Sequence, residues 1–422
     1  MSDALDTIAT MPARTRGSAL LTVAEAASIP AKEKAKLAQQ ALDAARATPP
    51  GSLNSIRSRE LAHVALYYSA HGDEPTARAI FDESLNTAQL SLGEQGSGGY
   101  RQVTDAMARE PVACKAWTVS AVAKRLQADH NATNTAFAYK DLAKVATALG
   151  DKPLAANFIR AGVAAAEGID QSSARKRLIE DFARVAVDAD YTASLPEEAP
   201  DTLAIKAMRA GNPQKALSII SGLSEGLYVS QRETAFQRVL DDAIKRDDLS
   251  AALYLAEHPV KQAAWTQAST WRRVAEMQIK HGSKNDAANS YSRAENAATA
   301  GLASPGYLAI EEAVALSDSL RQSGFGAEAR RVALSATSRL QQMPTRNVED
   351  RVKAGKLISE MLWRQGMRAQ AQRELLDAYR AAETIPSNQQ IVKARLMTGV
   401  GMALSTFAAD GAIANQSRKG AS

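Results

Sequence analysis

The chain has 422 residues, of which 45% are hydrophobic and 23% are charged, as in an average globular protein. A single compact core rarely serves more than about 300 residues, so we expect several domains or an array of repeats. The one cysteine, Cys114, excludes an intrachain disulfide framework and a thiolate metal cluster. No stretch reaches roughly 18 uncharged apolar residues, the length of a membrane helix. We expect a cytoplasmic protein, although an effector secreted without a cleaved signal has the same features.

Helical patterns begin within residues 1–50. The clearest covers residues 31–47, where Leu37 and Leu42 recur at helical spacing. The segment Pro49-Pro50-Gly51-Ser52 ends the block. We therefore predict an N-terminal helical cap over residues 1–50.

Short turns centred on one residue recur along the rest of the chain. Six of the seven have glycine at the centre, which ends a helix in the left-handed conformation that other residues resist. One copy has aspartate there instead. The turn residues are Gly72, Gly150, Gly211, Asp247, Gly282, Gly324 and Gly366.

The residues around each turn repeat as well. Eight positions before the turn every copy has an aliphatic residue, and in most copies a small one follows: Val64, Leu142, Leu203, Val239, Val274, Leu316 and Ile358 are the aliphatic set. Five positions after the turn every copy has alanine: Ala77, Ala155, Ala216, Ala252, Ala287, Ala329 and Ala371. A helix hairpin of this kind cannot bury its apolar face alone, so its copies should stack. The sequence predicts an all-α fold, an α-solenoid of antiparallel helix pairs.

This pattern resembles the tetratricopeptide repeat (TPR), which has a large–small pair before a glycine turn and an alanine after it. The resemblance covers residues 54–385 and implies a TPR-like superhelix whose first helices line a concave groove. We expect an irregular TPR-like block over residues 51–190, a second block over residues 201–385, and a hinge at residues 191–200. The segment Gln171–Asp190 departs from the family, and we expect it to be an extra helix that breaks the pairing.

The C-terminal quarter differs in charge from the rest. We predict a capping helix over residues 386–409 and a polar tail over residues 410–422. The whole chain has a net charge of +5, yet residues 321–422 alone hold 16 Lys and Arg against 8 Asp and Glu. This excess makes a nucleic-acid or membrane-surface binder one alternative function. A solvated helix surface accounts for the same excess.

A second alternative function is enzymatic. Arg125 and His130 match the Arg-x4-His spacing of HEPN ribonucleases, although Leu126 stands where that motif usually has a polar residue. The motif would need a helix pair whose geometry brings the two side chains together.

No other motif points to catalysis, to a cofactor or to a metal. The five histidines lack metal-ligand spacing. We interpret the acidic pairs Asp241-Asp242 and Glu311-Glu312 as parts of a helix surface and not as metal ligands. The expected function is therefore a non-enzymatic scaffold or adaptor, with no cofactor, whose partner is another protein.

The resemblance also implies where a partner would bind. Six residues before the turn, a TPR side chain points into the groove, and here that position is acidic in four successive units: Asp241, Glu276, Asp318 and Glu360. Bases and one exposed aromatic flank these acids: Arg272, Lys280, Arg321, Lys353, Lys356, Trp363 and Arg364. We expect this groove to bind a peptide or helix of matched charge. The pairs Arg272–Glu276 and Lys356–Glu360 also fit ordinary i, i+4 ion pairs.

Overall fold

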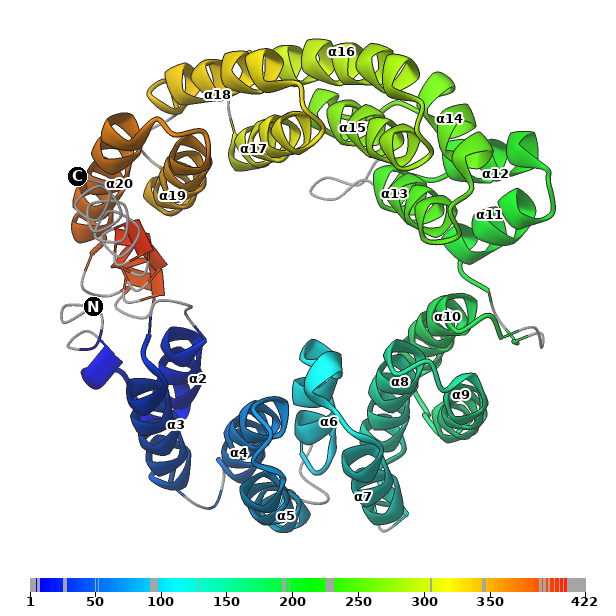
Figure 1. The fold of residues 1–422 in the computed structure, drawn as a ribbon. Helices are drawn as coiled ribbons and strands as arrows, with labels where there is room; N and C mark the ends of the chain where they lie inside the picture. Colours follow the sequence, from blue (N-terminus) through cyan, green and yellow to red (C-terminus); the bar gives the residue numbers. More distant parts are fainter. Residues whose placement is uncertain are drawn as a thin grey trace. The chain divides into compact units, whose positions relative to one another are not determined.

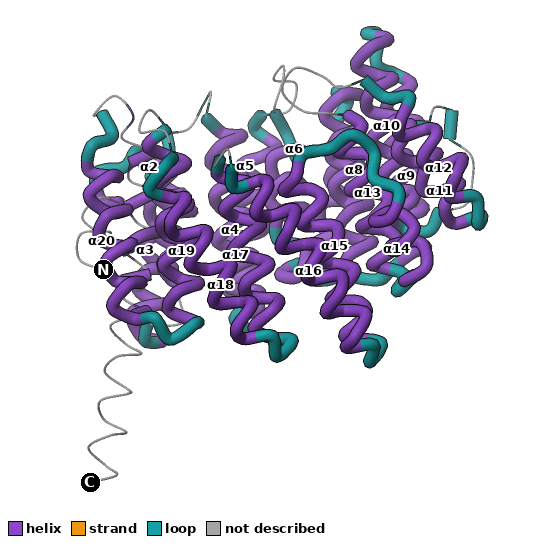
Figure 2. Tube along the Cα trace, turned by 90° about the horizontal axis from the view of Figure 1, so that it is seen from above, coloured by secondary structure: helices purple, strands orange, loops and turns teal. Residues whose placement is uncertain are grey.

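The computed structural model describes most of the chain as helices joined by short loops (Figures 1 and 2). The described residues are 5, 8–25, 29–49, 51, 53–91, 98–127, 129–191, 195–196, 198–224, 231–303, 306–343, 347–386, 389 and most positions of 392–407. No strand occurs among them. The predicted polar tail and part of the predicted hinge, residues 192–194 and 197, lie outside this set. The chain divides into two compact units, one of residues 8–203 and one that begins at residue 204.

The first unit alternates first and second helices along the chain. Its first helices are α2 (Ala13–Ala24), α4 (Asn54–Ala70), α6 (Arg101–Arg109), α8 (Ala132–Ala148) and α10 (Ser172–Asp188). Its second helices are α3 (Ala31–Arg46), α5 (Glu74–Gln89), α7 (Ala116–Leu126) and α9 (Lys152–Glu167), with a short 3-10 helix η1 (Pro111–Ala113) before α7. Successive first helices pack against one another from α2 to α10, and α2, α4 and α8 also pack on the second helix that follows.

The second unit repeats this arrangement. Its first helices are α11 (Pro200–Arg209), which spans the division, α13 (Gln231–Lys245), α15 (Ala264–Lys280), α17 (Tyr307–Gln322) and α19 (Val348–Arg364). Its second helices are α12 (Pro213–Ser221), α14 (Leu249–Glu257), α16 (Lys284–Gly301), α18 (Gly326–Leu340) and α20 (Arg368–Glu383). From α13 onward each first helix packs on its second helix and on the next first helix. The all-α fold of stacked antiparallel helix pairs is therefore confirmed.

The turn between the two helices of a pair has one geometry in all seven predicted copies. The turn residue has a positive φ in each, from 59° at Asp247 to 84° at Gly324. The N–H of the residue that follows the turn residue donates to the carbonyl of the residue five positions earlier, as Asp151 does to Ala146 at 2.9 Å. This is the pairing by which a left-handed residue closes a helix. The sequence pattern therefore predicted correctly that Asp247 takes the place of glycine in one of these turns.

An eighth copy of the turn ends α10 and was missed by the sequence pattern. Asp190 has a φ of 54°, and the N–H of Tyr191 donates to the carbonyl of Ala186 at 2.8 Å. Phe182 and Ala183 occupy the large and small positions and are fully buried. The predicted extra helix is thus a first helix of the array. Among the described residues no second helix separates it from α11.

The repeated positions form the core. All seven alanines five residues after the turn have no exposed surface, and the aliphatic residues eight before it are buried except Leu203, which is 42% exposed. Where the small position before the turn is serine, its hydroxyl joins the two helices of the pair. Ser317 donates to the carbonyl of Ala329 at 2.9 Å, and Ser359 donates to that of Ala371 at 2.7 Å. The alanine therefore lets the two backbones approach closely enough to share a hydrogen bond.

Gly162 in α9 tests this close packing. A methyl group built on it would overlap the ring of Phe182 in α10. We expect Gly162→Ala to lower the free energy of unfolding by about 1–3 kcal/mol, measured by urea denaturation, because an overpacked core must shift. The control is Gly326→Ala at the start of α18, where no atom lies within 4 Å and alanine favours the helix. Equal loss of stability in both variants would contradict the packing argument.

Candidate functional site

The four acids predicted to form a groove ladder are all paired within the chain. Two of them bind an arginine of the next first helix. Asp241 of α13 pairs with Arg273 of α15 at 2.6 Å, and Asp318 of α17 pairs with Arg364 of α19 at 2.5 Å. These pairs bridge neighbouring first helices, so the carboxylates already have a structural partner.

The other two acids form the i, i+4 pairs of a single helix. Glu276 lies 2.8 Å from Arg272, and Glu360 lies 2.7 Å from Lys356. Pairs of this kind on a helix surface are individually weak, with contributions of about 0.3–0.5 kcal/mol. The binding role predicted for all four acids stays a prediction.

The remaining predicted groove residues differ in what they contact. Lys280 pairs with Asp247 at 2.7 Å, and Lys353 pairs with Glu349 at 2.6 Å. The Nε of Arg321 is buried and has no hydrogen-bond partner among the described residues.

Trp363 is not the exposed aromatic that the sequence suggested. Its ring stacks on Phe407 of the C-terminal segment, with centroids 4.1 Å apart and planes inclined by 5°. The guanidinium of Arg368 covers it 5.1 Å from the ring centre. The ring of Trp363 therefore packs against the segment that contains Phe407. This contact is made with a residue outside the repeat of Trp363.

Two acids interpreted as helix surface are buried. Asp242 is 8% exposed and pairs with Arg209 of α11 at 2.5 Å. Glu312 is 7% exposed and receives two hydrogen bonds from Arg272 of α15, at 2.7 and 3.1 Å. Both face the preceding first helix. The sequence could not show this, because their burial depends on which side of a helix the neighbouring helix covers.

Arg272 stays charged in this buried position. Burial alone would lower the pKa of its guanidinium, but the hydrogen bonds and the charge of Glu312, with help from Glu276, raise that pKa above its ordinary value. The pair therefore joins α15 to α17 as a buried ion pair, whose members depend on each other.

Removal of one partner should expose this dependence. We expect Arg272→Ala to lower the free energy of unfolding by about 3–5 kcal/mol, because the buried Glu312 carboxylate loses its counter-charge. The control is Arg364→Ala, which removes the more exposed ion pair between Arg364 and Asp318. It should lower the free energy of unfolding by about 1 kcal/mol or less. The double variant Arg272→Met with Glu312→Leu should recover most of the loss in the same urea titration. A double variant as unstable as Arg272→Ala would contradict this account.

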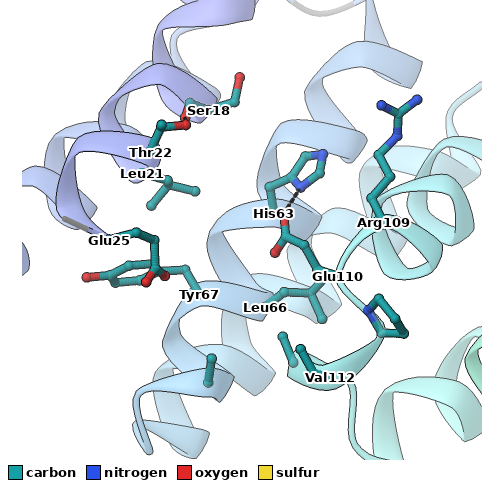
Figure 3. A pocket seen from close by; sticks show the side chains of 13 residues that line it. Ser18, Leu21, Thr22, Glu25, His63, Leu66, Tyr67, Arg109, Glu110 and Val112 are labelled. Carbon is teal, nitrogen blue, oxygen red and sulfur yellow. Dashed lines mark hydrogen bonds and ion pairs between the residues drawn. The ribbon is translucent and has the colours of Figure 1, made fainter. Parts of the chain in front are cut away.

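A pocket of about 500 Å³ opens among three successive first helices of the first unit (Figure 3). Helix α2 contributes Leu21 and Glu25, α4 contributes Leu66 and Tyr67, and α6 with η1 contributes the segment Arg109–Ala113. The lining is mostly apolar. Within that segment Val112 is 89% exposed at the rim, which is unusual for a large aliphatic side chain. Pockets of this size and character are typical of ligand sites.

Charged groups stand around the apolar lining. His63 Nδ1 lies 2.7 Å from Glu110 Oε1 on one wall, and the dashed line in Figure 3 marks this contact. Glu25 lies beside the ring of Tyr67 on another wall (Figure 3). Burial, and secondly the charge of Glu25, raises the pKa of the Tyr67 phenol above its ordinary value. Tyr67 therefore keeps its proton and can donate a hydrogen bond at neutral pH.

None of the pocket residues was predicted as a site, although one signal was available. Leu66 stands six residues before Gly72, the register position that is acidic in four later units. Tyr67 and Ala70 follow it on α4. The same position is also apolar in the unit of Gly211, where it is Ile205, so this signal alone does not locate the pocket.

Arg125 and His130 take separate places in the structure. The Nη1 of Arg125 donates to the side-chain oxygens of Asn86 and Gln89 on α5, at 3.0 and 3.2 Å. His130 is exposed in the loop before α8. No hydrogen bond joins the two residues in the described part of the chain. The ribonuclease hypothesis stays a prediction.

Asp141 of α8 is a buried acid that the sequence did not single out. Burial raises the pKa of this carboxyl to about 6, and the charges of Lys140 and Lys144 offset only part of that effect. The folded protein therefore binds a proton more tightly than the unfolded chain. The stability that this proton provides is present below pH 4 and is lost as the pH rises from about 4 to about 6.

The variant Asp141→Asn should remove this pH dependence. At pH 7.5 we expect it to raise the free energy of unfolding by up to about 3 kcal/mol, because the neutral amide avoids burial of a charge. At pH 4 the two proteins should have nearly equal stability. Thermal denaturation at both pH values measures the difference, and an equal gain at pH 4 and pH 7.5 would contradict the assignment.

The described residues show no group of three or more His, Cys, Asp or Glu that could hold a metal ion. Within the same residues, no helix has both the length and the apolar character needed to cross a bilayer. Cys114, next to the pocket, is buried, and burial raises the pKa of its thiol to about 12. Its thiol is therefore unreactive in the folded chain.

Comparison with known proteins identifies no family. No protein-family model matches the chain, and no curated protein matches it. Among solved structures it is similar to a protein described as a "Circular tandem repeat protein with novel repeat topology and enhanced subunit contact surfaces", with 15% sequence identity and a TM-score of 0.20. The match covers 97% of this chain and 99% of that one. Identity and TM-score at this level leave the function of the chain open, and what the structure itself establishes is a helical-repeat protein of stacked antiparallel pairs.

Proposed function

We propose that the chain is a non-enzymatic scaffold that binds a protein partner on the surface of its first helices. The observation that carries this proposal is the open, mostly apolar pocket among α2, α4 and α6 with η1, rimmed by Val112. Burial of apolar surface is the main source of affinity in protein association. A pocket that receives one anchoring side chain suits a scaffold of this kind.

We also propose that the array is a divergent relative of the tetratricopeptide repeat. The support lies in the left-handed turn residue and the buried alanine of seven units, and in the large–small pair that most of these units share. In that family the first helices present the binding surface. The pocket lies on first helices, at the register position of Leu66.

The pocket is a better anchor than the charged surface of the second unit. A partner that bound Asp241 or Asp318 would compete with Arg273 or Arg364, which already neutralise them. The pocket offers apolar surface without such competition.

Substitution at the pocket rim tests the proposal. We expect Val112→Asp to reduce recovery of a protein partner from native lysate at least tenfold, because it places a charge where an apolar contact forms. The matched control is Leu90→Asp at the end of α5, since Leu90 is 71% exposed and lies outside the pocket. Both variants should keep the melting temperature of the unaltered chain. Capture of the same partner by Val112→Asp at an unchanged level would refute the proposal.

A further inference from the structure

The pocket among α2, α4 and η1 also indicates the chemistry of its occupant. We propose that it receives a lysine side chain of the partner protein, with the aliphatic stem against Leu21 and Val112 and the ammonium at Glu25 and Tyr67. This inference rests on the proposed scaffold function and makes the anchoring residue specific.

The charges around the pocket favour a cation. Two carboxylates line it, Glu25 and Glu110, against one arginine, Arg109. The guanidinium of Arg109 is held by Asp105 of its own helix, at 2.9 and 3.3 Å, so its charge is balanced outside the pocket. The other carboxylate, Glu110, contacts His63 at 2.7 Å. The negative charge left in the pocket is therefore that of Glu25, and it attracts a positive group.

Glu25 is the carboxylate left to bind that group. Glu110 already contacts His63 at 2.7 Å. The side chain of Glu25 is exposed at the end of α2 and forms no ion pair or hydrogen bond with any described residue. The neighbouring hydroxyl of Tyr67 adds an acceptor oxygen. Carboxylate and hydroxyl thus supply two acceptors for one donor group.

The apolar walls account for the rest of the side chain. Lysine buries its methylene stem along apolar surface while its ammonium stays at a polar edge. Leu21 stands one helical turn before Glu25 on the wall formed by α2, and Val112 adds apolar surface at the rim. An ammonium has three donors in a compact head and suits acceptors in different directions, whereas a guanidinium prefers one carboxylate in its own plane. The geometry therefore points to lysine.

Two short peptides distinguish this inference from apolar binding alone. The probes are an acetylated, amidated heptapeptide of alanine and serine with one central lysine, and the same peptide with norleucine there, which keeps the stem and lacks the charge. With the full chain, saturation-transfer NMR should place contacts on the lysine δ and ε methylenes. We expect the lysine peptide to bind about fivefold more tightly at low salt, with the advantage lost at high salt.

Three substitutions locate the effect. Glu25→Gln should abolish the preference for lysine, and Tyr67→Phe should reduce it about two- to threefold because the ring stays and the hydroxyl is lost. The control Glu33→Gln removes an exposed carboxylate of α3 that lies outside the pocket, and it should leave the preference intact. Loss of the preference in the control as well would overturn the assignment of Glu25.

The peptide result separates this inference from the proposed function. Equal or tighter binding of the norleucine peptide would overturn the recognition of lysine, while a partner lost in Val112→Asp would still support the scaffold. If neither peptide binds and capture still depends on Val112, the inference fails alone. If capture is also independent of Val112, both fail.

Discussion

The close approach of two helices at the alanine five residues after each turn is the contact on which the rest of the structure depends. The alanine brings the second helix near enough for serines such as Ser317 and Ser359 to hydrogen-bond to its backbone. The left-handed turn residue reverses the chain in the short distance that this approach allows. Every pair then presents one apolar side to the next pair, and the array grows by stacking. A larger residue at the alanine would separate the helices and remove that shared side.

Stacking leaves a surface of first helices in each unit. In the second unit arginines cross from one first helix to the next and neutralise the carboxylates there, as Arg272 does for Glu312. These carboxylates are therefore already paired between neighbouring helices. In the first unit the pocket among α2, α4 and α6 with η1 hollows this surface, and its lining is mostly apolar. The first unit also joins its first helices by charge, as His63 and Glu110 do in the pocket wall, but the pocket leaves apolar surface and the Glu25 carboxylate open beside that contact.

The sequence predicted the fold well because the fold depends on local rules. The turn, the alanine and the large–small pair lie within a few residues of one another, and even Asp247 followed from register alone. Asp190 was missed because an aspartate turn is visible only when its neighbours are already aligned. The site was harder to predict, since burial of Asp242 and Glu312, the stacking of Trp363 on Phe407, and the pocket all depend on helices far apart in the chain. No single repeat contains that information.

The arginine–carboxylate pairs between first helices have a consequence for how such an array evolves. Each junction combines repeat positions in a different way: Arg209 with Asp242, Arg273 with Asp241, Arg272 with Glu312, and Arg364 with Asp318. A unit copied and inserted elsewhere would meet a neighbour without the matching charge, and a charged group would be left unpaired at the new junction. The units of this chain are therefore not interchangeable. The buried pairs, such as Arg272 with Glu312, favour the present order of neighbouring units most strongly.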